Sequence, residues 1–249
     1  METVLKLENI SKNFGGVEAL SDINFSLSRG ECLGIMGDNG AGKSTLIKII
    51  AGNYPASSGE IYLNNHEVKF KKPLDAQKKG IEVVYQDLAL CNNLTAYENI
   101  FLGRWISKFK IGPFNFVDFK KMEKKSGELF KDLKSDTRPK QLVQTLSGGQ
   151  KQAVALSRTR LSNPDIVIMD EPTAAISIKQ VKEVLQYILK LKENNVSIIL
   201  ISHRMMDVFE VCDRVIVLRR GIKVSDKKLK QSSPEEVTGL ITGAIDTSF

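Results

Sequence analysis

The stretch Gly37-Asp38-Asn39-Gly40-Ala41-Gly42-Lys43-Ser44 decides the fold of this 249-residue chain. It fits the pattern G-x-x-x-x-G-K-[ST], which describes a loop whose backbone N–H groups cradle phosphates. The apolar run Cys32–Met36 precedes it, and apolar residues at helical spacing follow it between Leu46 and Ile50. Because a strand, this loop and a helix occur in the order that the pattern requires, the segment predicts a nucleoside triphosphate site.

The residue types of the loop match the chemistry of a triphosphate bound with Mg²⁺. Glycines let the backbone curl until several N–H groups face one point, and the helix that follows directs its positive end there. Lys43 supplies a charge for the β- and γ-phosphates, the Ser44 hydroxyl is a ligand for Mg²⁺, and Thr45 is placed to donate to the α-phosphate. We therefore expect ATP to contact Gly37, Asp38, Asn39, Gly40, Ala41, Gly42, Lys43, Ser44 and Thr45.

The segment Ile166-Val167-Ile168-Met169-Asp170-Glu171 predicts a buried strand that ends in two carboxylates. Acidic residues at the carboxyl end of a parallel strand lie at the sheet edge where α/β proteins bind ligands. We expect Asp170 to hold Mg²⁺, directly or through water. We expect Glu171 to act on the attacking water, as general base or as the group that positions it. The alternative, Asp170 as a turn former before Pro172, leaves the Mg²⁺ site incomplete.

Strands and helices alternate along much of the chain, which is typical of an α/β fold. Runs that are apolar on both faces predict a parallel sheet covered by helices. These runs are Cys32–Met36, Ile81–Tyr85, Ile166–Met169, Val196–Ile201 and Arg214–Leu218. Apolar residues at helical spacing from Val181 to Ile188 predict one of the covering helices.

A smaller antiparallel sheet is predicted from period-two alternation near Leu5 and between Ile23 and Leu27. Two further short strands are expected at Glu60–Leu63 and Val68–Phe70, joined by the polar turn Asn64-Asn65-His66.

The region 88–162 is lysine-rich and shows few strand signals, so we interpret it as an inserted helical subdomain. Within it we expect loops at Lys110–Asn115 and Ser135–Pro139. Residues 1–87 and 163–249 would form the core with its antiparallel sheet, and the whole of 1–249 one domain.

Composition narrows the function. The net charge is +7, but no interleaved pattern of aromatic and arginine residues suggests a nucleic-acid platform, so we expect no nucleic-acid partner. Three cysteines without a C-x-x-C pair argue against a disulfide framework and against a zinc site. No stretch reaches the roughly 20 apolar residues of a membrane span, and the amino terminus lacks signal-peptide features, so we expect a chain that is neither secreted nor membrane-spanning.

The motif Leu146-Ser147-Gly148-Gly149-Gln150 matches the signature of ABC ATPases at all five positions. A plain helix start capped by Ser147 would have the same geometry, because small residues and free N–H groups also make an anion-binding end. Together with the phosphate loop and the acidic strand end, this motif makes almost the whole chain resemble an ABC-type nucleotide-binding domain. The resemblance implies an α/β P-loop NTPase core of ABC type, with an antiparallel β-subdomain and an inserted helical subdomain.

Further roles follow from the resemblance. Phe14 falls at the aromatic position that stacks on adenine, although packing of the outer sheet is an alternative for it. Gln86 falls at the glutamine that contacts Mg²⁺ and the reactive water, and His203 at the histidine that contacts the γ-phosphate. The implied catalytic residues are Glu171, His203, Gln86 and Lys43, and the implied Mg²⁺ ligands are Ser44, Gln86 and Asp170.

The resemblance also implies an assembly. Ser147, Gly149 and Gln150 would cap the ATP of a partner chain, most simply a second copy in a head-to-tail homodimer. A finer resemblance is to ATP-binding subunits of bacterial sugar importers of the ribose, galactose and fructose type. Its carriers are Tyr85–Leu90, Tyr97–Arg104, Glu171–Ser177 and Ile241–Ala244. It implies a transport-coupled ATPase at the cytoplasmic face of the membrane, bound to permease subunits near 87–104 and working indirectly with a substrate-binding protein.

The chain departs from the common ABC pattern at two places. The usual S-A-L-D after the catalytic glutamate is Ala174-Ala175-Ile176-Ser177, so a serine replaces the aspartate, and the signature helix reads Leu156-Ser157-Arg158-Thr159-Arg160 instead of an alanine-rich run. Two other functions stay open: a soluble ABC ATPase acting on DNA or ribosomes, and a regulatory module that does not hydrolyse ATP. The first usually carries long insertions, and the second does not need intact catalytic residues.

Overall fold

The computed structural model describes residues 2–111, 114–174 and 176–245, which fold into two compact units. The first unit consists of Met1–Val83, Pro164–Pro172 and Leu185–Phe249. The second consists of Val84–Asn163 and Thr173–Val184. The segment Thr173–Val184 therefore belongs to the second unit, although in the sequence it lies between two strands of the first.

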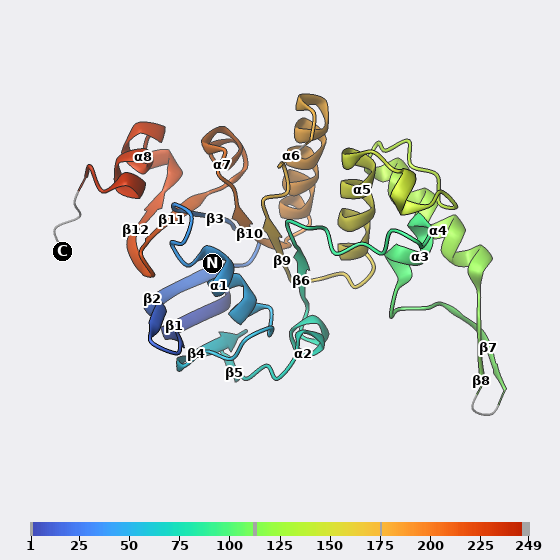
Figure 1. Ribbon diagram of the computed structural model, residues 1–249, viewed down its shortest axis with the longest axis horizontal. Coiled ribbons are helices and arrows are strands. Elements are labelled where there is room, and N and C mark those ends of the chain that lie inside the picture. Colours follow the sequence, from blue (N-terminus) through green and yellow to red (C-terminus); the bar gives the residue numbers. More distant parts are fainter. Residues whose placement is uncertain (1, 112–113, 175, 246–249) are drawn as a thin grey trace. The chain divides into compact units, whose positions relative to one another are not determined.

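A six-stranded sheet organises the first unit, in the order β12-β11-β3-β10-β9-β6 (Figure 1). β11, β3, β10 and β9 run parallel, and β12 is antiparallel to β11 at the edge. Every residue of β3, β9 and β10 is buried, as their apolar sequences require. The strand bounds are β3 Cys32–Met36, β6 Ile81–Val84, β9 Ile166–Asp170, β10 Ser197–Ile201, β11 Arg214–Arg219 and β12 Ile222–Lys228.

A second, four-stranded antiparallel sheet has the order β2-β1-β4-β5. Its strands are β1 Thr3–Phe14, β2 Val17–Ser28, β4 Ser58–Leu63 and β5 His66–Val68. The expected strand at Val68–Phe70 and the three-residue turn were wrong. Asn64 and Asn65 both have positive φ, 48° and 64°, and make a two-residue hairpin turn that pairs Leu63 with His66.

Short helices accompany these sheets. Leu46, Ile47, Ile49 and Ile50 of α1 are buried in the core with apolar residues of both sheets. Each such side chain contributes roughly 1.5–3 kcal/mol when fully buried. The helices are α1 Lys43–Ile50, α2 Pro73–Lys78, α7 Met205–Val211, η2 Leu229–Gln231 and α8 Pro234–Thr242, and α6 Ile178–Glu193 runs through both units. None of the helices formed by the described residues is long and apolar enough to cross a membrane.

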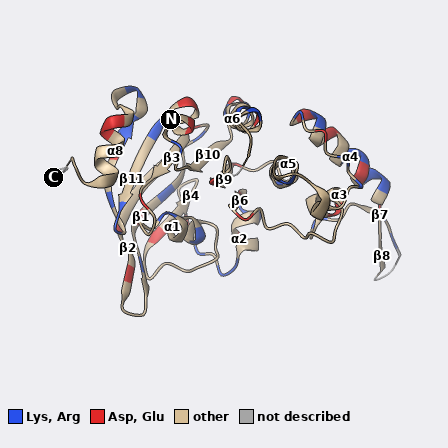
Figure 2. Cartoon of the chain, turned by 45° about the horizontal axis from the view of Figure 1, so that its top comes forward, with Lys and Arg blue, Asp and Glu red and all other residues tan. Residues whose placement is uncertain are grey.

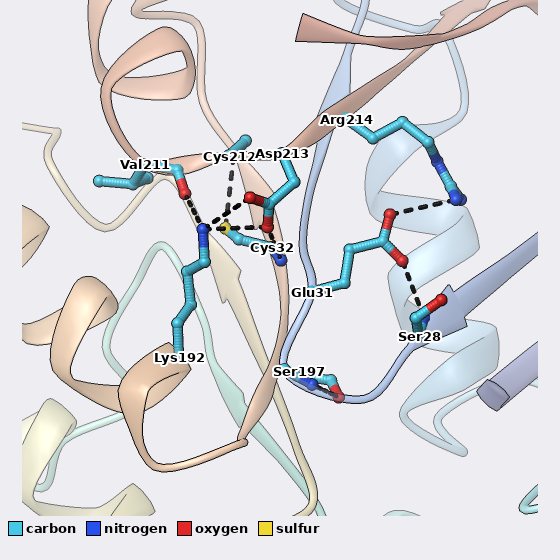
Figure 3. Close-up of polar contacts among 10 residues, drawn as sticks. Ser28, Glu31, Cys32, Lys192, Ser197, Val211, Cys212, Asp213 and Arg214 are labelled. Atoms are coloured by element: carbon cyan, nitrogen blue, oxygen red, sulfur yellow. Dashed lines mark hydrogen bonds and ion pairs between the residues drawn. The ribbon is translucent and has the colours of Figure 1, made fainter. Parts of the chain in front are cut away.

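Polar contacts anchor the first residues of β3 and β11 (Figure 3). The Lys192 ammonium donates to the carbonyl oxygen of Val211 and to Asp213 Oδ1, both at 3.0 Å. Asp213 Oδ2 accepts from the backbone N–H of Cys32 at 2.9 Å. Cys32 and Cys212 are free thiols with their sulfurs 3.4 Å apart. Because these bonds fix the start of β3, they also fix where its other end releases the phosphate loop.

The second unit is mainly helical. Its core joins α3, α4 and α5 through buried residues that include Ile100, Phe101, Phe130 and Val154. The outer surface of α4 carries charges of both signs (Figure 2). The elements are α3 Ala96–Phe101, β7 Ser107–Ile111, β8 Phe114–Val117, α4 Phe119–Asp132, η1 Val143–Thr145 and α5 Gly148–Thr159.

The loop expected at Lys110–Asn115 was wrong at both ends, which lie in the antiparallel strands β7 and β8, and its middle, 112–113, lies outside the described residues. Phe109 and Phe116 pair across the strands with stacked rings, 4.6 Å between centroids. The alternation of lysine and asparagine with aromatic residues is a strand signal that the lysine content concealed. The loop expected at Ser135–Pro139 does lie outside helices and strands.

Candidate functional site

The phosphate-binding pattern forms the predicted strand–loop–helix in the first unit. β3 ends at Met36, the loop curls through glycines with positive φ, and α1 begins at Lys43. Gly37 has φ 153°, and a Cβ there would lie 2.2 Å from the carbonyl oxygen of Leu218 in β11. Real Cβ atoms essentially never come within 3.0 Å of such an atom. Glycine is therefore required for the loop to leave the sheet at this angle.

The start of α1 presents free hydrogen-bond donors. Its N-cap is Gly42, which has no side chain to accept from the first turn. The backbone N–H groups of Lys43, Ser44 and Thr45 therefore point out of the helix without intrahelical acceptors, at the positive end of the helix dipole. The hydroxyl-bearing residue Ser44 is exposed and Thr45 is half-buried at the same end. This arrangement binds anions, and phosphate in particular.

Lys43 places its positive charge inside the loop. Its side chain is buried, and its ammonium donates to the carbonyl oxygens of Gly37 at 2.6 Å and Asp38 at 2.9 Å. Burial lowers the pKa of Lys43, and the nearby carboxylates of Glu171, Asp170 and Asp38 partly offset that effect. The charge that would meet a β- or γ-phosphate is thus held in place by the loop itself.

Sheet register brings the acidic strand end to the loop. Asp170 is the last residue of β9 and lies opposite Ile201 of β10, which in turn lies opposite Ile35 of β3. Three neighbouring parallel strands therefore end at the same edge, and each is followed by a predicted site residue: Lys43 after β3, Glu171 after β9 and His203 after β10. The edge matches the general rule that α/β sheets bind ligands at the carboxyl ends of their strands.

Glu171 and His203 form a pair at this edge. The backbone N–H of His203 donates to Glu171 Oε2 at 3.3 Å, and His203 Nε2 lies 3.2 Å from Glu171 Oε1. Burial raises the pKa of Glu171, although the contacts with His203 oppose the rise. Glu171 Oε1 is buried, and its contact with His203 Nε2 does not have the geometry of a hydrogen bond. A buried carboxylate with a raised pKa suits a general base that acts on a water.

Glu171 also has an unusual backbone. Its φ is 52°, in the left-handed region, and its N–H donates to the carbonyl oxygen of Ile201 at 3.0 Å. Such a conformation costs about 1–3 kcal/mol and persists where the surrounding structure holds it. It turns the chain sharply after Asp170, so that two consecutive carboxylates share one edge of the sheet.

The oxygen atoms at the edge fit a magnesium site. Mg²⁺ usually keeps several waters and takes one or two protein oxygens besides the substrate phosphates. The Ser44 hydroxyl and the Asp170 carboxylate supply oxygens of this type. Ser44 follows Lys43 at the start of α1, and Asp170 lies near Lys43 at the edge where β3, β10 and β9 end. Among the described residues no group of three or more His, Cys, Asp or Glu could hold a metal ion. A hydroxyl and a carboxylate are the donors that Mg²⁺ takes when it also binds phosphate oxygens.

Phe14 is an exposed aromatic residue at the end of β1, 45% exposed. Tyr54, which sequence reasoning missed, packs edge-on against it at 5.5 Å with rings 79° apart. Lys12 lies over the Phe14 ring at 5.1 Å and Lys48 over the Tyr54 ring at 5.6 Å. The exposed ring is compatible with stacking on a base, and that role stays a prediction. Tyr54 could be found in the sequence only by noting an aromatic residue soon after the phosphate-loop helix.

The other predicted site residues belong to the second unit. Gln86 is exposed and follows β6. Ser147 caps α5: its Oγ accepts from the backbone N–H of Gln150 at 3.3 Å, and Gln150 Oε1 accepts from the backbone N–H of Ser147 at 2.9 Å. This capping box leaves the small residues Gly148 and Gly149 at the first turn of the helix. The roles of Gln86, Ser147, Gly149 and Gln150 stay predictions.

Comparisons with known proteins bear on the whole chain. A family model described as ABC transporter matches residues 20–174. The chain is 39% identical over 243 residues to the ribose import ATP-binding protein RbsA of Caldanaerobacter subterraneus subsp. tengcongensis, a match that covers 98% of this chain and 48% of that protein. It is 40% identical over 245 residues to the xylose/arabinose import ATP-binding protein XylG of Sulfolobus acidocaldarius, covering 97% and 95% of the two chains. The chain thus spans about half the length of the ribose relative and nearly all of the xylose/arabinose relative.

A solved structure supports the fold. The dimeric post-hydrolysis structure of the ATP-binding cassette MJ0796 with ADP and Pi superimposes with a TM-score of 0.78 and 27% identity, covering 90% of this chain and 98% of that one. This likeness confirms the predicted fold class, an α/β cassette of ABC type that combines a mixed central sheet with an antiparallel sheet of four strands.

Proposed function

The chain belongs to the ABC transporter family as one of its ATP-binding cassettes, and from that premise we propose that it hydrolyses ATP to drive the import of a sugar. The observation that carries the hydrolytic part is the Glu171–His203 pair. These residues follow β9 and β10, the two strands that come next in the sheet after β3, which leads into the phosphate loop. A regulatory module that does not hydrolyse ATP would not need a buried carboxylate with a strained backbone at position 171.

We propose a task for each site residue of the first unit. The N–H groups of the loop and the Lys43 ammonium bind the phosphates, and Phe14 stacks on the adenine. Glu171 orients a water toward the γ-phosphorus and takes its proton as the bond to the β-phosphate oxygen breaks. His203 contacts the γ-phosphate next to that water. Ser44 and Asp170 would hold Mg²⁺, with Gln86 as a further predicted ligand, and the ion would supply positive charge for the phosphates.

The second half of the site comes, in this proposal, from a second copy of the chain. Ser147, Gly149 and Gln150 of one copy cap the ATP bound by the loop of the other, which requires a head-to-tail dimer. A capping box that leaves free N–H groups at the start of α5 supports this reading, because it is a second anion-binding helix end. ATP would close the dimer and hydrolysis would reopen it.

The transport role is drawn from the relatives. Two of them are named as import ATP-binding proteins for pentoses, so we propose a monosaccharide importer, with permease subunits as membrane partners and a substrate-binding protein as an indirect one. The chain would then lie at the cytoplasmic face of the membrane. A permease and a binding protein encoded in neighbouring reading frames, and co-purification of the chain with that permease, would support this; a chain found only with DNA or ribosomes would contradict it.

Two variants test the ATPase. Glu171→Gln should bind ATP, lose turnover and form a stable dimer on size-exclusion chromatography, while the wild-type chain turns ATP over slowly and rarely dimerises. Turnover by Glu171→Gln at the wild-type rate would refute the assignment of the base. Lys43→Ala should lose nucleotide binding or turnover, and unchanged activity would refute the phosphate site.

A further inference from the structure

The start of α6 carries a polar cluster that the proposed function does not use. Ser177 and Gln180 form a capping box there: the Ser177 backbone N–H and hydroxyl donate to Gln180 Oε1 at 3.0 Å and 3.1 Å. In return the Gln180 backbone N–H donates to Ser177 Oγ at 3.4 Å. With its oxygen bound twice to Ser177, the side-chain amide of Gln180 has a fixed direction.

The amide points at Gly149, which lies in the signature turn Ser147–Gln150. A Cβ built on Gly149 would lie 1.6 Å from Gln180 Nε2 and 2.0 Å from Gln180 Cδ. The Gln180 amide therefore occupies the volume that a side chain at position 149 would need. Ser177, Gln180, Gly149 and Gln150 all belong to the second unit and line one cavity of about 280 Å³.

The contact explains the serine that stands where the common family pattern has aspartate. An aspartate can accept from the N–H of Gln180 and so cap α6 equally well. It has no proton to donate to Gln180 Oε1, however, and its carboxylate would repel that oxygen. The hydroxyl caps the helix and adds a second hydrogen bond to Gln180 Oε1, beside the one that the backbone N–H of residue 177 donates.

We propose that Gln180, aimed by Ser177, is a positioning residue that supports the Gly149 backbone in the shape that caps the ATP of a second copy. This inference rests on the proposed function, which gives the turn Ser147–Gln150 that task. It adds a mechanical link: the segment that follows the catalytic Glu171 braces the turn that completes the partner's site. The amide does not contact the nucleotide in this scheme and acts through Gly149.

The contact itself is tested by a double-mutant cycle on stability. Gly149→Ala should lower the melting temperature in the wild-type background, because the new methyl group must displace the Gln180 amide from Ser177. In the Gln180→Ala background that volume is open, so the same substitution should cost clearly less. Equal costs in the two backgrounds would refute the contact. The variants are expected to fold, because truncation of Gln180 enlarges an existing cavity at its edge.

The positioning role is tested in the Glu171→Gln background by the dimer dissociation constant at saturating ATP, from sedimentation velocity. Gln180→Ala should weaken the dimer by about tenfold, since each dimer contains two such turns and both lose the contact between the Gln180 amide and Gly149. Affinity of the monomer for ADP should stay unchanged, because the loop Gly37–Ser44 is intact. Lys182→Ala, an exposed residue on the same helix, is the matched control and should leave both values unchanged.

Conservative variants separate positioning from helix capping. Gln180→Glu keeps an acceptor for Ser177, so its melting temperature should match that of the parent with Gln180. Its dimer should stay as weak as that of Gln180→Ala, since glutamate lacks the amide and adds a negative charge beside Gly149. Ser177→Asp should likewise keep the melting temperature and weaken the dimer. A dimer as tight in Gln180→Ala as in its parent would overturn the inference. If Glu171→Gln itself stays monomeric with ATP, the proposed function fails instead.

Discussion

Gly37→Ala tests how the sheet and the phosphate loop are joined. The new methyl carbon would lie 2.2 Å from the Leu218 carbonyl oxygen and 3.0 Å from Ala41 Cβ, whereas ordinary contact begins near 3.4 Å. Because the Leu218 atom is backbone in the neighbouring strand β11, rotation of a side chain cannot relieve the overlap. Overpacking of this kind costs about 1–3 kcal/mol, and a sparsely populated backbone conformation costs about 1–3 kcal/mol more. For a chain of this size, each kcal/mol lowers the melting temperature by roughly 2–4 °C.

Gly40→Ala is the matched control. Gly40 belongs to the same loop and also has positive φ, 79°, but a Cβ there meets nothing within 4 Å. Its substitution should cost only the backbone term, about 1–2 kcal/mol. Thermal unfolding of the nucleotide-free proteins, with ATP affinity measured in parallel, compares the two. Gly37→Ala should melt several degrees below Gly40→Ala. Equal melting temperatures would refute the argument that contact with Leu218 demands glycine at position 37.

Three further predictions use stability. Glu171→Gln should be more stable than wild type near pH 8 and equal to it near pH 4. Burial raises the pKa of Glu171 in the folded state, so wild type loses folding stability as pH rises from the unfolded pKa of Glu171 to its folded pKa, whereas glutamine does not ionise and loses none. A difference in denaturant midpoints that does not change with pH would contradict this. Ser147→Ala should cost about 1 kcal/mol by removing the cap of α5, visible as a lower urea midpoint, whereas no change would mean that the cap is dispensable. Phe101→Ala, at a side chain 2% exposed, should cost about 4 kcal/mol, and a cost below that of Ser147→Ala would contradict its place in the core.

Local rules explain where the sequence predicted the fold well. The bounds of β3 were predicted to the residue, because a strand buried on both faces shows as an uninterrupted apolar run. The same rules failed at the β7–β8 hairpin. Phe109 and Phe116 are exposed and stack on each other, so no buried apolar face distinguished these strands from the surrounding lysines. They also misplaced β5, because the positive φ of Asn64 and Asn65 shortened the turn.

By itself the sequence determined the chemistry: the glycines and Lys43 of the phosphate loop, the consecutive carboxylates Asp170 and Glu171, and the signature turn are local patterns whose residue types imply their use. The tertiary structure decided which of these groups meet. Register between β10 and β9 places Glu171 beside His203, 32 residues further along the chain, and register between β10 and β3 brings both to the strand that precedes the phosphate loop. No local pattern encodes such an alignment between separate segments. The same holds for Gln180 against Gly149, a contact made by chain packing and visible in the sequence only as a serine and a glutamine three residues apart.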